Sequence, residues 1–429
     1  MLVILVDGSI WQNPRNKKVL IASNSLKLEV KLYYFSNNLH RKSDLVFLSS
    51  CSETVESFDL SPINLFSKLF TSVFAKLCNF SFVPAWLLVH LRFLRNLYVY
   101  RVFIWNLFFG GFTAVWASSS QALGLLRQLQ YLLNRLNVTI IYDFQDVLSD
   151  DTSSLSLSNS LRRVLAGDEK WIMQAANTLL FASRAMKDYL RHSFGFNCSR
   201  HQPMHVVYNS FSDSFDPSLS LYCDFKPPVL DDHSLSVVWF SQTVGIDRGL
   251  SLFFEACEVT QFPVEFHIYG YESPPVRQWL SNWQIRCPSL KLVSMGIVSH
   301  QQLAASLPFY DVGLSLESVD ISNRNLTITN KVLMYLQSGI FAICTPTIGH
   351  QELLDEFPDQ MQLCDTSREM HSCLRSAYLG RYCISLRREF FVNRFNSSSF
   401  GWDAQVSKYH QILRGLFSSS IPSLTSRSC

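Results

Sequence analysis

Residues 239–250 combine a loop and side chains that could bind an anion. They read Trp-Phe-Ser-Gln-Thr-Val-Gly-Ile-Asp-Arg-Gly-Leu, an apolar run that enters a loop at Gly245, and a helix is predicted to open at Arg248. A helix start offers unpaired N–H groups at the positive end of its dipole, and a guanidinium beside it can make bidentate contact with a diphosphate. The spacing matches neither GxGxxG nor GxxxxGK[ST], so a glycine turn with a solvated arginine is the alternative.

A second group of polar residues lies within residues 310–339. The predicted strand Asp-Val-Gly-Leu-Ser-Leu ends at Glu317, where an exposed carboxylate could hold sugar hydroxyls. After a polar loop, Thr329, Asn330 and Lys331 begin an amphipathic helix. Cations are normally disfavoured at a helix N-terminus, so Lys331 indicates an anionic partner such as phosphate, with a solvated lysine as the alternative.

The third stretch, residues 340–354, is a predicted strand followed by Thr-Pro-Thr-Ile-Gly-His-Gln-Glu and the start of another helix. The backbone amides around Gly349 and His350 could hold a phosphate or a sugar, with Glu352 near the helix start.

Two loops of the first half also carry polar residues after predicted strands. Gly8, Asn13 and Arg15 follow the first strand, and Asp143 and Asp146 follow a later one. Open parallel sheets bind ligands at the carboxyl ends of their strands, so we expect these residues to contact a bound sugar from the opposite wall of the site. Asp143 and Asp146 could instead cap the helix that follows them.

The elements that position these loops follow from the hydrophobic pattern. Short apolar runs alternate with helical-period stretches, which is typical of parallel strands joined by crossover helices. Strands are predicted at residues 2–6, 30–35, 45–48, 112–117, 138–142, 178–181, 205–208, 237–240, 264–269, 291–295, 312–316, 340–344 and 360–363. Helices are predicted at residues 16–26, 121–136, 159–176, 185–192, 248–257, 300–307, 330–337, 351–356 and 402–416.

The chain length favours two domains. Its 429 residues are too many for one ordinary core, and a Ser-, Asp- and Pro-rich stretch follows Asn209. We predict an α/β fold in which two Rossmann-like domains face each other across a cleft. The first domain covers residues 1–208, with an amphipathic insert at about 60–109, and the second covers residues 209–395. Residues 396–429 are predicted to form a C-terminal helix that returns to the first domain, followed by a flexible tail.

The amino-acid composition limits which binding partners and which cellular compartment we expect. A net charge of +3 is too small to favour a nucleic-acid-binding protein. The eleven cysteines show no paired CxxC spacing and no secretory leader is recognised, so we expect reduced thiols in the cytoplasm. Residues 65–109 are rich in aromatic and basic residues without a run long enough to span a bilayer. They could lie on the inner face of a membrane, or simply pack on the first sheet.

The loop sequences resemble the GT-B retaining glycosyltransferases often grouped as family four. The similar phrases of the second half are Ser-Gln-Thr-Val-Gly-Ile-Asp-Arg-Gly-Leu, Tyr-Asp-Val-Gly-Leu-Ser-Leu-Glu, Thr-Asn-Lys-Val-Leu-Met-Tyr-Leu-Gln-Ser-Gly and Gly-His-Gln-Glu-Leu-Leu. In the first half, Pro-Arg-Asn-Lys-Lys at 14–18, Tyr-Asp at 142–143 and Asp-Glu-Lys-Trp at 168–171 look similar too. Residues 50–109 match nothing specific in that family.

The resemblance implies a donor domain in the second half and an acceptor-side domain in the first. Arg248 and Lys331 would hold the donor diphosphate and neutralise the leaving nucleotide, and no metal or other cofactor is implied. Family members usually carry an acidic residue that holds the nucleotide ribose where this chain has Met334, and a thioether is only a weak acceptor.

The leading hypothesis is therefore a glycosyltransferase that moves a sugar from a nucleotide-diphosphate sugar to a glycan or lipid-linked acceptor, with retention. A non-catalytic relative that binds a nucleotide sugar or a partner protein is the alternative that Met334 favours. A sugar-nucleotide epimerase would need further acid–base groups, for which His300 and His350 are available, although each is more typical of a surface or capping histidine.

Overall fold

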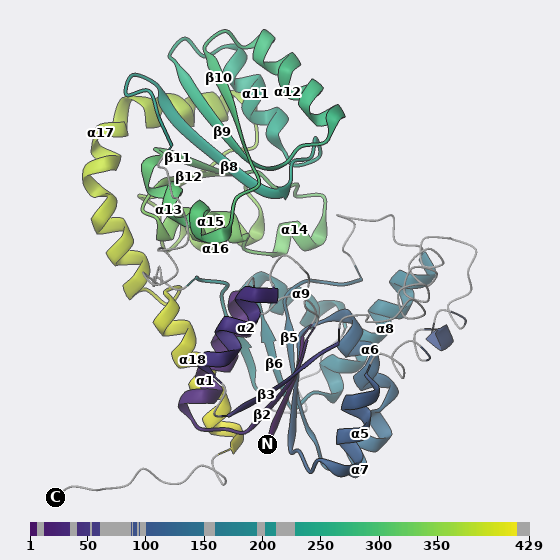
Figure 1. Cartoon of the computed structure of the whole chain (residues 1–429). Helices are drawn as coiled ribbons and strands as arrows, with labels where there is room; N and C mark the ends of the chain where they lie inside the picture. Colours follow the sequence, from purple (N-terminus) through teal and green to yellow (C-terminus); the bar gives the residue numbers. More distant parts are fainter. Residues whose placement is uncertain are drawn as a thin grey trace, which may run out of the picture. The chain divides into compact units, whose positions relative to one another are not determined.

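The computed structural model describes two compact units (Figure 1). The described residues are 1–6, 13–34, 41–51, 54–60, 87, 89–91, 94, 100–149, 159–194, 202–211 and 228–417. The first unit combines Met1–Ala182, Met186–Tyr208 and Asp403–Cys429, and the second combines Ser183–Ala185 and Asn209–Trp402. Among the described residues, no helix has both the length and the apolar character needed to cross a membrane.

The first unit is built on a parallel sheet of seven strands. In space its strands run β3-β2-β1-β4-β5-β6-β7. Their bounds are β1 Leu2–Leu5, β2 Val30–Tyr34, β3 Val55–Asp59, β4 Ala114–Ala117, β5 Thr139–Phe144, β6 Thr178–Phe181 and β7 Met204–Val206. Most of these strands are buried, as expected for a parallel sheet with helices on both faces.

Helices cover both faces of the first sheet. Their bounds are α1 Pro14–Ser25, α2 Arg41–Ser50, α5 Arg101–Phe109, α6 Ser120–Gln128, α7 Gln130–Arg135, α8 Asn159–Ala175, α9 Arg184–Ser193 and α18 Trp402–Phe417. Helices α1, α2 and α18 share one core with β1, β2 and β4, whereas α5 and α6 lie on the other side of the sheet (Figure 1). The last described helix of the chain thus packs on its first strands.

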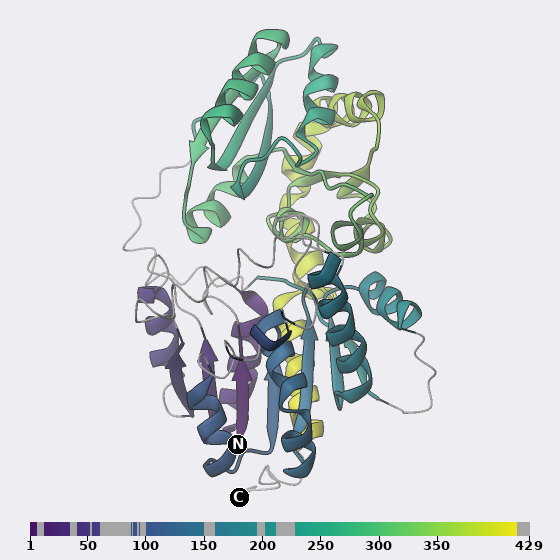
Figure 2. The same cartoon turned by 90° about the vertical axis from the view of Figure 1, so that its right-hand side faces the viewer.

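The second unit has a parallel sheet of six strands in the order β10-β9-β8-β11-β12-β13. Their bounds are β8 Leu235–Thr243, β9 Val264–Tyr271, β10 Leu290–Gly296, β11 Val312–Ser315, β12 Phe341–Cys344 and β13 Met361–Leu363. Figure 2 shows the strands of each sheet running side by side with helices packed along them. Each sheet therefore has the strand order of a Rossmann fold, with a reversal beside its first strand.

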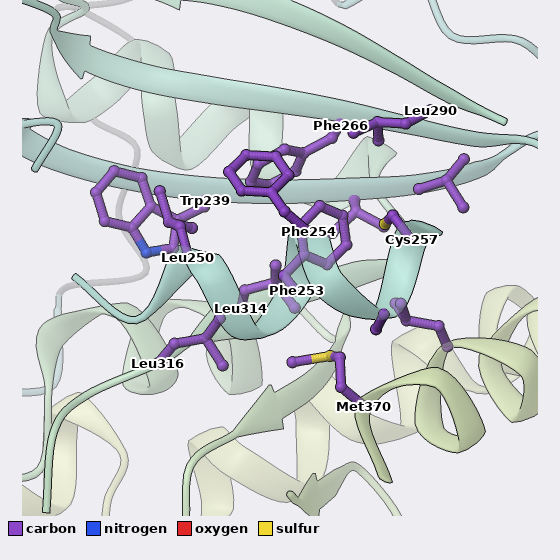
Figure 3. Packing of buried hydrophobic residues seen from close by; sticks show 14 of the residues in the cluster. Trp239, Leu250, Phe253, Phe254, Cys257, Phe266, Leu290, Leu314, Leu316 and Met370 are labelled. Atoms are coloured by element: carbon purple, nitrogen blue, oxygen red, sulfur yellow. The ribbon is translucent and has the colours of Figure 1, made fainter. Parts of the chain in front are cut away.

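The core of the second unit is aromatic. Its helices are α11 Leu250–Glu258, α12 Pro274–Arg286, α13 His300–Ser306, α14 Ser322–Leu326, α15 Asn330–Gln337, α16 Ile348–Leu354 and α17 Ser367–Ser397, with a 3-10 turn at Leu307–Phe309. Phe253 and Phe254 of α11 point towards Phe266 of β9, and Met370 of α17 closes the cluster (Figure 3). The opposite face is covered by α15, whose Tyr335 ring stands edge-on to Phe240.

Most predicted elements are confirmed within a few residues, but two predictions differ from the structure, and four elements, β3, α12, α14 and α17, were not predicted. Residues 45–48 were predicted to form a strand and lie inside helix α2, because a short apolar run has no period that separates strand from helix. Strand β3 was not predicted, since its sequence Val-Glu-Ser-Phe-Asp is largely polar. The predicted helix at 121–136 is divided at Leu129 into α6 and α7.

Candidate functional site

The predicted phosphate-binding loops follow the strands at the reversal of the second sheet. β8 and β11 are neighbours there, although they are not consecutive in the chain. In open sheets of this type ligands bind outside the carboxyl ends of the strands, at this point of reversal. Gly245 and Arg248 follow β8, and Glu317 follows β11. The topology therefore brings two of the predicted loops to one edge of the sheet.

Arg248 lies in a turn and not in a helix, because α11 begins only at Leu250. The prediction of a helix start at Arg248 is wrong by two residues. Gly249 takes the helix cap position with φ 73°, a left-handed conformation that favours glycine. Arg248 itself is half-buried, and its side chain forms no ion pair or hydrogen bond with any residue in the described parts of the chain. Its guanidinium therefore has no counter-charge among the described residues.

Two glycines let the Arg248 turn pack tightly. A Cβ on Gly249 would lie 2.9 Å from the carbonyl oxygen of Leu316, the residue before Glu317. A Cβ on Gly245 would lie 2.6 Å from Asp247 Oδ1 and 3.3 Å from Arg248 Cγ. The loop after β8 thus contacts the loop after β11 directly, and Arg248 and Glu317 are the chain neighbours of the two residues that meet, Gly249 and Leu316.

Arg324 connects the same two loops. It was not predicted to be a site residue. Its Nη1 donates to the carbonyl oxygen of Asp247 at 3.2 Å, and its Nη2 lies 3.4 Å from Asp247 Oδ2. The arginine is buried, and its Nε has no hydrogen-bond partner in the parts of the chain that the structure describes. The positive charge of Arg324 also contributes to lowering the pKa of Glu317. A buried guanidinium in a short polar helix has no local sequence signal, so only the fold could reveal it.

Glu317 and Lys331 form an ion pair within the second unit. Lys331 Nζ lies 2.7 Å from Glu317 Oε1, and the two side chains are 12% and 5% exposed. Burial alone would raise the pKa of Glu317, but the charge and hydrogen bond of Lys331, with smaller effects of His350 and Arg324, hold that pKa below its ordinary value. Glu317 is thus ionised and buried, which corrects the expectation of an exposed carboxylate. Lys331 is not a solvated lysine, because it contacts Glu317 and lies 5.7 Å from the Trp239 ring centre.

The start of α15 is capped by a predicted site residue. The Thr329 side chain accepts from Val332 N at 3.4 Å and lies 2.7 Å from Ser315 Oγ at the end of β11. Asn330 is exposed, and its Oδ1 accepts from Asn209 Nδ2 at 3.3 Å. Met334 is almost fully buried, so little of its thioether side chain is accessible to a ligand. The helix itself has the bounds that the sequence predicted.

The residues that follow β12, which were predicted to contact a ligand, make several contacts within the protein itself. α16 begins at Ile348, three residues before the predicted start. A Cβ on Gly349 would lie 2.5 Å from the carbonyl oxygen of Thr327, so this glycine permits close backbone packing. Glu352 accepts from Arg184 N at 2.9 Å and lies 3.5 Å from Arg184 Nε, so its carboxylate already has a partner.

His350 is buried, whereas a surface or capping histidine was expected; its burial excludes the surface position. Its Nδ1 lies 2.8 Å from the Thr345 carbonyl oxygen, and its Nε2 lies 3.2 Å from Ser315 Oγ. Nδ1 therefore donates and Nε2 accepts from the hydroxyl, as in a neutral imidazole. Burial lowers the pKa of His350 to about 4. His300 lies at the start of α13, where its ring packs 4.8 Å from the Phe211 ring.

Several predicted site residues of the first unit form contacts within the protein. Arg15 and Asp143 form a buried ion pair, and Arg15 Nη1 also donates to the carbonyl oxygen of Val207. Asp143 lies inside β5, so neither helix capping nor direct contact with a sugar fits its position. Asn13 caps α1 and donates to Gln145 Oε1 at 2.8 Å, whereas Asp146 is exposed. Gly8 and most of residues 65–109 lie outside the described residues.

Comparison with known proteins identifies the fold. A scan against protein-family models matched none, and a comparison with curated proteins gave no match. A structure of HepE from Anabaena with UDP has a TM-score of 0.57 at 13% identity, over 98% of this chain and 100% of that chain. A glycosyltransferase from Rickettsia africae has a TM-score of 0.58 at 10% identity, over 98% and 99% of the two chains. Together with the two parallel sheets in Rossmann order, these similarities show that the chain has the α/β GT-B fold.

Proposed function

We propose that this protein is a glycosyltransferase that binds a nucleotide-diphosphate sugar at the reversal of its second sheet. The observation that carries the proposal is the half-buried Arg248 guanidinium, which has no ion pair with a described residue. Its loop contacts the loop of the buried Glu317–Lys331 pair, because Gly249 packs against Leu316. An anion that fits between a guanidinium and an ammonium at a strand's carboxyl end is a diphosphate. UDP and UDP-glucose, the ligands in structures of HepE, are molecules of this class.

In the proposed reaction, positive charge stabilises the leaving group. The bond between the anomeric carbon and the diphosphate oxygen breaks, and its electron pair stays on the diphosphate. An acceptor hydroxyl oxygen forms the new bond to the anomeric carbon, and its proton passes to the departing diphosphate. Arg248 and Lys331 neutralise the charge that develops there, a contribution that preorganised cations make efficiently. Glu317 keeps the Lys331 ammonium fixed through their 2.7 Å contact.

We infer further that the acceptor is a glycan or a lipid-linked sugar, that transfer proceeds with retention and that no metal is needed. The exposed aromatic residues of α5, Trp105, Phe108 and Phe109, support contact with a membrane surface, where a lipid-linked acceptor would lie. We propose that the protein lies on the cytoplasmic side of that membrane, which the free cysteines among the described residues support.

The proposal is tested by screening nucleotide sugars for binding and for slow donor hydrolysis. The wild type is compared with Arg248→Ala and Lys331→Ala, and Arg277→Ala on the exposed face of α12 serves as a control for removing an arginine. Loss of a charge-assisted hydrogen bond costs about 1.5–3 kcal/mol, so each site variant should bind the donor about 10- to 100-fold more weakly. EDTA should leave binding and hydrolysis unchanged. Equal donor binding by all four proteins would contradict the assignment of Arg248 and Lys331 to the donor site.

A second candidate function is a binding protein of the same fold that no longer transfers sugar. Met334, buried and unable to accept a strong hydrogen bond, favours this alternative. It predicts donor binding that depends on Arg248 and Lys331 without hydrolysis or transfer. Product formation with any acceptor excludes it.

A further inference from the structure

The long helix α17 exposes a row of apolar side chains on its outer side. Leu379, Tyr382, Leu386 and Phe390 are 73%, 74%, 67% and 55% exposed. Spacings of three and four residues place them on one face of a helix. We call these four residues the outer stripe of α17. Large apolar side chains that are gathered and left exposed are typical of an interaction surface.

The outer stripe is separate from the face of α17 that packs in the second unit. Met370, Leu374, Ala377, Phe391 and Phe395 are buried on that other face. Figure 1 shows α17 as one long helix at the edge of the second unit. The helix is therefore anchored at both ends by its own unit, and its middle presents a second apolar face.

Two leucines of the outer stripe are placed symmetrically about its middle. Leu379 and Leu386 lie equally far from the midpoint between Tyr382 and Cys383, and so do Arg375 and Phe390. Glu389 lies one residue nearer to that midpoint than Phe390. Arg375 and Glu389 are both exposed, and neither forms an ion pair with another described residue.

We propose that the outer stripe of α17 binds a second copy of this chain, with the two α17 helices antiparallel about a twofold axis near Tyr382 and Cys383. A twofold interface brings the same patch of both subunits together, so each contact occurs twice. Leu379 packs on Leu386 of the partner subunit, and Arg375 pairs with Glu389 of the partner subunit.

Charge favours a second copy over a lipid surface. A helix that lies on an anionic bilayer carries cations along its polar border, whereas the exposed charges beside this stripe have both signs: Arg375 and Arg387 are cations, and Glu389 is an anion. Arg387 already lies 3.7 Å from Asp359 of its own unit. In the antiparallel dimer the Glu389 carboxylate meets the Arg375 of the partner subunit. The stripe covers about 18 Å of helix at 1.5 Å per residue, a short contact, so the dimer should form at micromolar concentrations.

Charge reversal tests the antiparallel register. Sedimentation velocity is run from low to high micromolar concentration on the wild type, Arg375→Glu, Glu389→Arg and the double variant. Each single variant places two like-charged pairs across the axis and should weaken dimerisation about tenfold. The double variant restores both pairs and should recover wild-type association. Arg277→Glu, the same change on α12, should have no effect.

Cross-linking tests the position of the axis. Cys383 is the one exposed cysteine among those the structure describes. A short bismaleimide should join Cys383 to Cys383 of the partner subunit, as identified by mass spectrometry, and Cys383→Ser should remove this product. The proposal is overturned if the wild type is monomeric at all concentrations, or if Leu386→Glu dimerises as well as the wild type. Binding to anionic vesicles that Leu386→Glu abolishes would assign the stripe to a membrane and also overturn it.

Discussion

Arg324 connects the loop that carries Arg248 with the loop that carries Glu317. Its guanidinium donates to the Asp247 carbonyl oxygen, and its charge contributes to the lowered pKa of Glu317. Arg324 is therefore a positioning residue for the neighbouring Arg248. We expect Arg324→Ala to weaken donor binding about tenfold, because displaced binding groups lose much of their contribution. Isothermal titration with the donor measures the change.

Asp247→Asn is the matched control for this effect. It keeps the backbone carbonyl oxygen that Arg324 contacts at 3.2 Å and removes only the exposed carboxylate charge. Donor affinity should stay within about twofold of the wild type, since exposed ion pairs contribute little. Unchanged affinity in Arg324→Ala would show that Arg324 does not position the turn.

His350 makes the stability of the second unit depend on pH. Its pKa falls from an ordinary 6.5 to about 4 because it is buried, so the unfolded state binds a proton more readily than the folded state. The stability is fully present above pH 6.5 and is lost as the pH falls towards 4. Between pH 7.5 and pH 5 the loss due to His350 is about 2 kcal/mol.

Chemical denaturation at pH 7.5 and pH 5 measures this contribution. His350→Asn removes the titrating group and keeps a side chain that can donate and accept hydrogen bonds. The variant should be less stable at pH 7.5 but lose about 2 kcal/mol less than the wild type on acidification. The same acid loss in both proteins would contradict a neutral, buried His350.

Among the elements, those with a strong helical or apolar period could be predicted from the sequence. The bounds of α15 are those predicted, and α8 differs at one end by one residue, because each has a clear apolar face and a polar start. The long helix α17 was not predicted, because its middle carries apolar and charged residues on all sides. The outer stripe of α17 explains this pattern, since a helix with two apolar faces has no single amphipathic period.

Gly249 determines how the Arg248 turn joins α11. Its φ of 73° and its approach to Leu316 both disfavour a side chain. Gly249→Ala should therefore cost at least about 1–2 kcal/mol of stability and also weaken donor binding, because the turn must shift. Gly380→Ala in α17, where nothing lies within 4 Å of the added Cβ, should be neutral or stabilising. Thermal unfolding and donor titration compare the two, and equal behaviour would contradict a strained Gly249.

At the scale of the whole molecule, the prediction of an α/β fold with parallel sheets is confirmed. Alternating strand and helix patterns imply crossover connections, but they do not give the order of strands in space. The order in each sheet, and hence the reversal between β8 and β11, came only from the structure. The Arg15–Asp143 pair shows the same limit, because residues 128 positions apart meet only in the folded unit.

The roles of Arg248 and Lys331 stay predictions, and one comparison tests them most directly. The affinity of the protein for a nucleoside diphosphate is measured beside that for the matching monophosphate, using the nucleotide of the best donor. The wild type should prefer the diphosphate by at least about tenfold, which corresponds to about 1.4 kcal/mol from charge-assisted contacts to the second phosphate. Arg248→Ala and Lys331→Ala should each reduce this preference and leave monophosphate binding unchanged. A preference that survives in both variants would contradict a diphosphate held between these two residues.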